Sequence, residues 1–197
     1  MIAIVDYGAG NLTSVRLAFA ALGAETVVTS DPEVIRRADR IVFPGVGAAK
    51  SAMTNLKALG LDGVIREVAE SGRPFLGICL GMQILFERTE EDGGVEMLGL
   101  LPGQVRRFPS DRGEKVPEIG WNPVRVSGDA LGVRDGSEFY FVHSYYAEKG
   151  DLSVGLTEYA GVTFTSMVRK GRLWACQFHP EKSGRIGLNL LKEWLSC

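Results

Sequence analysis

The sequence predicts an α/β fold of three layers, in which helices flank a mostly parallel or mixed central sheet. In the first half of the chain, helical patterns alternate with apolar runs of strand length at residues 2–5, 26–29, 40–43 and 75–79. Such alternation implies right-handed crossovers and parallel strands. The second half has shorter strand-like runs among prolines and glycines, which predict antiparallel or mixed strands added to the parallel half. With 197 residues, 45% of them apolar, the chain can bury one core, so we expect one domain over residues 1–197.

The helices follow from apolar periodicity and from end signals. A loop is expected at residues 6–10, and Asn11 is expected to cap the first helix. Asp31 and Pro32 open a short second helix. Further helical patterns run over residues 48–59 and 61–71. A closing helix from about residue 183 carries a stripe expected to pack in the core, formed by Ile186, Leu190 and Trp194. The strand-like runs of the second half lie at residues 105–108, 124–126, 138–142, 162–165 and 173–178.

Composition narrows the class of protein. The formal charge of −2 gives no basic excess for binding phosphate backbones, so nucleic acid is not an expected partner. The apolar runs are shorter than the roughly 20 residues that span a membrane, and the first residues lack the features of a signal peptide, which indicates a cytoplasmic protein. The cysteines are three and widely spaced, and neither a disulfide framework nor a metal site nor a cofactor is expected. Cys176 and Cys197 are expected to be dispensable.

A cysteine stands between two glycines where the fourth strand gives way to an amphipathic segment. This G-x-C-x-G pattern at residues 77–81 is similar to the G-x-S-x-G elbow of serine hydrolases, whose sharp strand-to-helix turn tolerates no Cβ clash. A thiol held at the start of a helix is favoured as thiolate by unpaired N–H groups and the helix dipole. The pattern predicts that Cys79 is a nucleophile after a central strand, although a buried structural cysteine beside a packing glycine fits the same five residues.

The chain contains two histidines, so the base for Cys79 is His143 or His179 unless another residue type serves. Glu181 lies two residues after His179, and in extended chain such residues project to one face. The carboxylate can then orient the ring and stabilise the imidazolium. Pro180 between them stiffens the geometry. His143 alternates with aromatic residues and is interpreted as structural or substrate-lining, so we favour a relay of Cys79, His179 and Glu181.

These residues, in this order, resemble the class I, triad-type glutamine amidotransferases. Within that family the chain is similar to the glutaminase subunits of imidazole glycerol phosphate synthase, an enzyme of histidine biosynthesis. The resemblance spans nearly the whole chain, and its most specific segments are D-Y-G-x-G-N at 6–11, P-G-V-G at 44–47, G-W-N at 120–122 and H-P-E-K-S at 179–183. One departure is Glu118, where the family usually has histidine; it leaves the role of that segment open and does not touch the triad.

The resemblance implies a reaction and a set of site residues. Cys79 would attack the side-chain amide carbon of glutamine, His179 would move the proton to the leaving ammonia, and water would cleave the thioester. The oxyanion hole would be formed by the amide of Leu80 and by Val46 or Gly47 from the P-G-V-G segment. The glutamine backbone would be held by Gly47, Gln83 and Glu91, with Ser144 and Tyr145 lining the pocket. For Glu91, a solvated loop acid is an equally good interpretation.

The resemblance also implies a partner. Free ammonia is protonated and lost in water, so a glutaminase of this kind passes it to a second protein. In the family that protein is a (β/α)₈-barrel cyclase subunit, which makes imidazole glycerol phosphate and aminoimidazole carboxamide ribonucleotide, and a heterodimer is implied here. Trp121, Tyr140 and Lys182 are the interface candidates. Ordinary packing of the two aromatic residues and a solvated lysine are the alternatives.

Three other functions remain open from the residues alone. The chain could serve another acceptor, as the pyridoxal phosphate synthase glutaminase does, although Trp121-Asn122 and Lys182-Ser183 speak against it. A catalytically silent regulatory module of the same class would be expected to lack a triad member, and none is lost here. A simple hydrolase would turn over glutamine without any partner protein.

Overall fold

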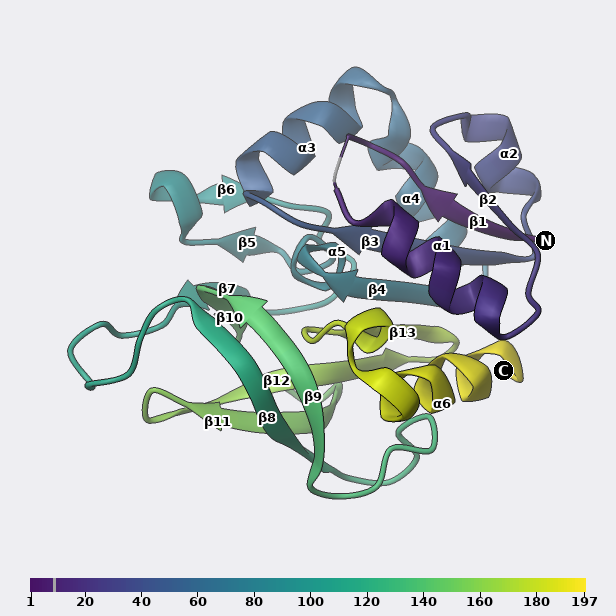
Figure 1. Ribbon diagram of the computed structural model, residues 1–197. Helices are drawn as coiled ribbons and strands as arrows, with labels where there is room; N and C mark the ends of the chain where they lie inside the picture. The colour runs from purple at the N-terminus through teal and green to yellow at the C-terminus, as the bar shows by residue number, and fades with distance from the viewer. Residues whose placement is uncertain (9) are drawn as a thin grey trace.

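A thirteen-stranded sheet forms the centre of the protein in the computed structural model, which describes residues 1–8 and 10–197 (Figure 1). The main path of the sheet has the order β2-β1-β3-β4-β13-β12-β10-β7-β5-β6, and β11, β8 and β9 continue from β12. The strands are β1 (Ile2–Val5), β2 (Thr26–Thr29), β3 (Arg40–Gly45), β4 (Phe75–Cys79), β5 (Arg88–Thr89), β6 (Val95–Glu96), β7 (Gln104–Arg107), β8 (Glu118–Val126), β9 (Ser137–His143), β10 (Tyr145–Ala147), β11 (Ser153–Tyr159), β12 (Val162–Lys170) and β13 (Leu173–Cys176).

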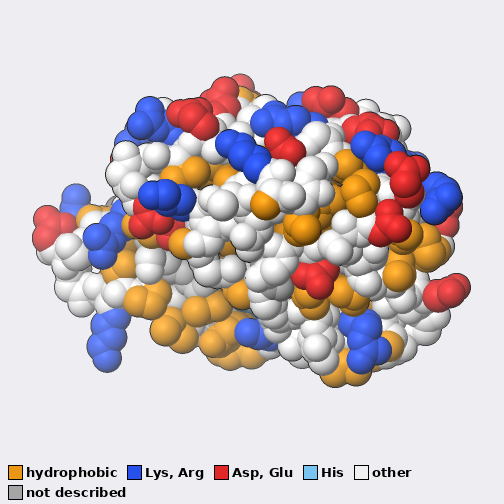
Figure 2. Space-filling view, turned by 90° about the horizontal axis from the view of Figure 1, so that it is seen from above, with side chains coloured by type: hydrophobic (Ala, Val, Ile, Leu, Met, Phe, Trp, Pro, Cys, Tyr) orange, Lys and Arg blue, Asp and Glu red, His pale blue; other side chains and the backbone are white. Residues whose placement is uncertain are grey.

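Helices cover both faces of the parallel half, which confirms the three-layer α/β prediction. They are α1 (Leu12–Ala21), α2 (Pro32–Arg37), α3 (Ala49–Ala58), α4 (Leu61–Glu70), α5 (Leu80–Gln83) and α6 (Gly184–Leu195), with 3₁₀ turns η1 (Glu91–Gly93) and η2 (Pro180–Lys182). Helices α2, α3 and α4 pack in one apolar cluster, and α1 and α6 pack in the other (Figure 1). Seen from above in Figure 2, the molecule carries basic and acidic side chains interspersed, as expected from the small net charge.

Alternate residues of each central strand face the two helical layers. In β3, Ile41 and Phe43 belong to the cluster with α2, α3 and α4, whereas Val42 belongs to the cluster with α1 and α6. Because both faces are buried, these strands read as continuous apolar runs rather than as an alternating pattern. This is why four strands of the parallel half could be predicted from the sequence.

The last strand of the chain lies in the middle of the sheet. β13 pairs in parallel with β4 on one side and antiparallel with β12 on the other. β4 in turn pairs in parallel with β3. The carboxyl ends of β3, β4 and β13 therefore meet at one edge, which is where open α/β sheets bind their ligands.

Several details differ from the expectations. β8 begins at Glu118, well before residue 124, and it includes Pro123. Proline is tolerated there because β11 pairs only with the last residues of this strand, near Arg125. Strands β10 and β11 were not predicted, since they are short or largely polar. The expected core stripe of α6 is wrong at Ile186, which is 39% exposed, whereas Leu190 and Trp194 are buried.

The loop expected at residues 6–10 includes residue 9, which lies outside the described residues. Within residues 1–8 and 10–197, every helix is too short or too polar to cross a membrane.

Candidate active site

Cys79 lies in a strained turn at the carboxyl end of β4. Its backbone has φ 55° and ψ −113°, a conformation that residues with a side chain rarely adopt. The turn passes close to β3, because a Cβ atom at Gly81 would lie 1.8 Å from the carbonyl oxygen of Phe43. Glycine at position 81 is therefore required by this close approach. The turn holds the Cys79 side chain at the residue just before α5, in a buried position.

His179 and Glu181 follow the end of β13 and contact each other. The Nδ1–H group of His179 donates to Oε1 of Glu181 over 2.7 Å, and both side chains are buried. The Ser183 hydroxyl donates to the His179 carbonyl and accepts from the Tyr140 amide, which ties the segment to β9. Donation from Nδ1 fixes the ring and leaves Nε2 as the nitrogen available for proton transfer.

The charge state of His179 depends on its two neighbours. Burial favours the neutral ring, but interactions with Cys79 and Glu181 outweigh it and raise the pKa of His179 to about 10. Both neighbours therefore favour the protonated ring. A protonated ring beside a thiol is the arrangement that favours a reactive thiolate.

Asn11 contributes a contact that the sequence did not predict. It occupies the N-cap position of α1, as predicted, with φ 72°, but its side chain makes no capping bond to the helix. Its Nδ2 instead donates to Oε1 of Glu181 over 2.5 Å. Because Asn tolerates the left-handed conformation, the backbone can turn its amide away from the helix and toward the carboxylate. The position in the D-Y-G-x-G-N segment was the only signal in the sequence.

A cavity of about 360 Å³ opens at Cys79 and His179, which is a size typical of small-molecule sites. It brings together every residue that the resemblance proposed for the oxyanion hole and for glutamine binding. These are Val46, Gly47, Leu80, Gln83, Glu91, Ser144 and Tyr145. Gly47 has φ 93°, so the peptide before it has a freedom that other residues lack.

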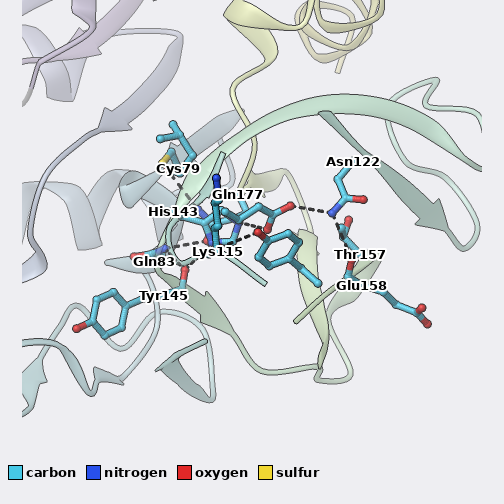
Figure 3. A network of polar contacts seen from close by, with 12 residues as sticks. Cys79, Gln83, Lys115, Asn122, His143, Tyr145, Thr157, Glu158 and Gln177 are labelled. Atoms are coloured by element: carbon cyan, nitrogen blue, oxygen red, sulfur yellow. Dashed lines mark hydrogen bonds and ion pairs between the residues drawn. The ribbon is translucent and has the colours of Figure 1, made fainter. Parts of the chain in front are cut away.

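The side chain of Gln83 links β10 to the residue that follows β13. Its Nε2 donates to the Tyr145 carbonyl over 2.7 Å and to Oε1 of Gln177 over 2.8 Å (Figure 3). Nε2 of Gln177 in turn lies 3.7 Å from the Cys79 sulfur. Gln177 was not predicted as a site residue, because its position beside the sulfur depends on the pairing of β13 with β4.

Glu91 is more than a solvated loop acid. Its Oε2 accepts a hydrogen bond of 2.6 Å from the Ala49 amide at the first residue of α3. Burial raises the pKa of its carboxyl group, and the Ala49 hydrogen bond acts in the opposite direction. The carboxylate thus lies at the cavity, fixed to a helix N-terminus.

His143 is both buried and cavity-lining, as its interpretation from the sequence allowed. Its ring lies among aromatic side chains, with ring centroids 5.2 Å from Phe108 and 5.3 Å from Phe164. Its Nε2 is 3.0 Å from Oε2 of Glu118. Glu118, the departure noted in the sequence, is thereby placed against a residue of the cavity.

The three interface candidates lie side by side on β8, β9 and η2. Trp121 and Tyr140 are paired across the strands, with ring centroids 6.2 Å apart. The Lys182 ammonium lies 6.0 Å from the Tyr140 ring centroid. Trp121 is 55% exposed and its neighbour Ile119 is 63% exposed, so Trp121 is not an ordinary core residue.

The remaining cysteines are free, and neither of them lines the cavity of Cys79. Cys176 is buried in β13, and burial raises the pKa of its thiol well above the usual value. Cys197 is partly buried at the end of the chain. In the part of the chain that the structure describes, no cluster of His, Cys, Asp or Glu side chains could hold a metal ion.

Comparison with known proteins points to one family. The sequence profile of the family glutamine amidotransferase class-I matches residues 3–195. The HisH subunit of imidazole glycerol phosphate synthase from Herpetosiphon aurantiacus is 50% identical over 199 residues, covering 99% of this chain and 93% of that protein. The HisH subunit from Dehalococcoides mccartyi is 50% identical over 198 residues, covering 98% and 96%.

Solved structures support the fold independently. A glutamine amidotransferase crystal structure superposes with a TM-score of 0.77 at 20% identity, covering 100% of this chain and 98% of that chain. A glutamine amidotransferase from Thermotoga maritima gives a TM-score of 0.66 at 20% identity, covering 99% and 80%. At this level of identity the likeness concerns the three-layer fold alone.

Proposed function

Since this chain belongs to the class I glutamine amidotransferases and, within them, to the HisH subunits of imidazole glycerol phosphate synthase, we propose that it is the glutaminase subunit of that synthase. It hydrolyses glutamine to glutamate and ammonia and passes the ammonia to a cyclase subunit in histidine biosynthesis. The observation that carries the proposal is the buried His179–Glu181 pair at the cavity of Cys79. The 50% identity to HisH subunits favours this synthase over the pyridoxal phosphate synthase.

The reaction begins with Cys79 as thiolate and His179 as imidazolium. The sulfur attacks the amide carbon of glutamine, and the tetrahedral intermediate collapses when Nε2–H of His179 gives its proton to the leaving ammonia. The neutral ring then takes a proton from water as the water attacks the thioester. Collapse of the second intermediate releases glutamate and restores the thiolate and the imidazolium. Glu181 holds the ring in place and stabilises its positive charge throughout.

The oxyanion of both intermediates needs preorganised N–H donors, each worth roughly 3 kcal/mol in measured oxyanion holes. The Leu80 amide, at the first residue of α5, supplies one donor. The peptide between Val46 and Gly47 supplies the other. With glycine at position 47, this peptide can turn at little steric cost, so the second donor can be switched by a partner.

The backbone end of glutamine is held on the far side of the same cavity. Glu91 directs its free oxygen, Oε1, to the α-ammonium group, while Oε2 stays bound to the Ala49 amide. Gly47 and Gln83 complete this end of the site, and Ser144 and Tyr145 line the wall. No cofactor enters this chemistry.

The cyclase subunit, a (β/α)₈ barrel, docks on the face formed by Ile119, Trp121, Tyr140 and Lys182. This face combines exposed apolar side chains with an aromatic ring under a lysine ammonium, a composition typical of interface hot spots. It lies next to the catalytic segment, because Lys182 follows Glu181 directly. Docking there shields the departing ammonia from water.

The test measures glutamate release by this chain alone, with the purified cyclase subunit, and with that subunit and its nucleotide substrate. A low rate alone and strong stimulation by both additions are expected. A full rate for the isolated chain that the cyclase leaves unchanged would retain the Cys79 chemistry but reject the assigned partner.

A further inference from the structure

Glu118 and His143 form a second buried carboxylate–imidazole pair, separate from His179 and Glu181. They face each other across the first register position of the β8–β9 ladder. The distance from His143 Nε2 to Glu118 Oε2 is 3.0 Å, and each side chain is only 3% exposed. The other carboxylate oxygen, Oε1, accepts from Asn122 Nδ2 over 2.8 Å.

One hydrogen bond fixes the orientation of the His143 ring. His143 Nδ1 lies 2.8 Å from the Tyr145 carbonyl oxygen, and a carbonyl can only accept, so Nδ1 carries a hydrogen. Nε2 of the ring then lies 3.0 Å from Glu118 Oε2, in an ion-pair contact in which neither atom makes a hydrogen bond within the described residues.

The pair acts on the glutamine cavity through one backbone group. The Tyr145 carbonyl accepts from both His143 Nδ1 and Gln83 Nε2 (Figure 3). It is thus held between two fixed donors, and Tyr145 and Gln83 both line the cavity. If the His143 ring changed its position, the Tyr145 carbonyl would lose one of its two hydrogen-bond donors.

The pair also forms the partition between two cavities. His143 lines the cavity of Cys79, whereas Glu118 lines a neighbouring cavity of about 590 Å³ together with Ile119 and Trp121. Successive residues of a strand point to opposite sides, so Glu118 reaches inward where Ile119 reaches solvent. Strand β8 therefore carries both the exposed side chains of the proposed docking face, Ile119 and Trp121, and the carboxylate that contacts His143.

We propose that Glu118 and His143 are positioning residues: Glu118 contacts the His143 ring, and the ring holds the Tyr145 carbonyl against Gln83, so that β8 sets the shape of this side of the glutamine-binding cavity. This inference rests on the proposed glutaminase function for its kinetic consequence. The hydrogen-bond arrangement itself can be tested without any turnover.

The kinetic test compares Glu118→Ala and Glu118→Gln in the complex with the cyclase subunit. Alanine removes the contact between residue 118 and His143. KM for glutamine should then rise about tenfold while kcat stays within about threefold, as expected for a lost binding contact. Glutamine at 118 can donate to Nε2 of the neutral ring and accept from Asn122, so it should restore KM to within about threefold of the wild type. Glu158→Gln is the matched control, because Glu158 lines the same neighbouring cavity but its side chain is exposed.

The structural test is the ¹⁵N and ¹H NMR spectrum of the imidazole rings in the isolated chain. The sequence has two histidines, so a His179→Asn variant assigns the His143 signals directly. The wild type and Glu118→Gln should both show a slowly exchanging Nδ1–H of His143, and Glu118→Ala should show its exchange accelerated.

Each outcome bears on one proposal. A His143 ring without hydrogen on Nδ1 in the wild type, or a Glu118→Ala variant with unchanged KM, overturns the positioning role. The same holds if Glu118→Gln fails to rescue although its circular dichroism is native. Absence of glutamate release from the wild-type complex would reject the glutaminase function and leave the NMR result on the pair intact.

Discussion

Asn11 and Glu181 are 170 positions apart, yet the Asn11 amide donates to the same carboxylate oxygen that accepts from His179. Oε1 of Glu181 is thus held from two sides. The second oxygen of this carboxylate is buried, so no solvent is at hand to replace a lost donor. Asn11 therefore helps to position the residue that orients the proposed base.

We expect Asn11→Gly to lower kcat for glutamine hydrolysis about tenfold, because a hydrogen bond to a charged group contributes roughly 1.5 to 3 kcal/mol. Glycine is chosen because it keeps the positive φ of this residue. Asn11→Asp should be worse, since it sets a second carboxylate against Glu181. Steady-state glutamate release in the complex measures both. Equal rates for Asn11→Gly and the wild type would reject the positioning role.

The raised pKa of His179 links folding stability to pH. The folded chain binds this proton more tightly than the unfolded chain, whose histidine has an ordinary pKa of 6.5. The resulting stabilisation is fully present below about pH 6.5 and is lost as the pH rises toward the folded-state pKa of about 10. The measurement is the urea midpoint of the wild type and of His179→Gln at pH 6 and at pH 10. The wild type should be more stable than the variant at pH 6, and this difference should be smaller at pH 10.

A control for this pH effect is the same comparison in a Cys79→Ala background. In that background, the stability advantage of the chain with His179 over its His179→Gln variant should change less between pH 6 and pH 10, because Cys79 is one of the groups that raise the pKa of His179. A stability advantage that stays constant from pH 6 to pH 10 would contradict the assignment of the proton.

The backbone conformation of Cys79 predicts different stabilities for two variants that are both inactive. Cys79→Ala and Cys79→Gly should both abolish glutamine-dependent synthesis while leaving ammonia-dependent synthesis by the complex. The glycine variant should be about 1 kcal/mol more stable than the alanine variant, because only glycine adopts φ 55° and ψ −113° without strain. Chemical denaturation of the two variants gives this difference, and a more stable alanine variant would show that the turn is not strained.

The docking face can be tested by truncation. Trp121→Ala should weaken cyclase binding by at least about 2 kcal/mol, roughly thirtyfold in Kd, as for hot-spot residues. Its free energy of unfolding should change little, because the side chain is 55% exposed. Leu17→Ala is the matched control, since Leu17 is 54% exposed on α1. Calorimetric titration measures both, and equal affinities would place the interface elsewhere.

Sequence reasoning succeeds here where the signal is local. The elbow around Cys79 and the His179–Glu181 spacing are each contained in a few consecutive residues, so both can be read without knowing the fold. The contacts of Asn11 and Gln177 cannot, because they depend on which strands are neighbours. The pairing of Glu118 with His143 needs in addition the exact register of β8 on β9, which no sequence pattern specifies.

The central place of β13 has a consequence for the synthesis of the protein. The sheet cannot close before this strand is made, because it separates β4 from β12, although β4 comes about a hundred residues earlier in the chain. His179 and Glu181 follow it, so a nascent chain that already contains Cys79 still lacks its base. Contacts of such large sequence separation form late in folding. A chain that has not yet added β13 to the sheet would therefore carry the Cys79 thiol without the histidine proposed to act on it.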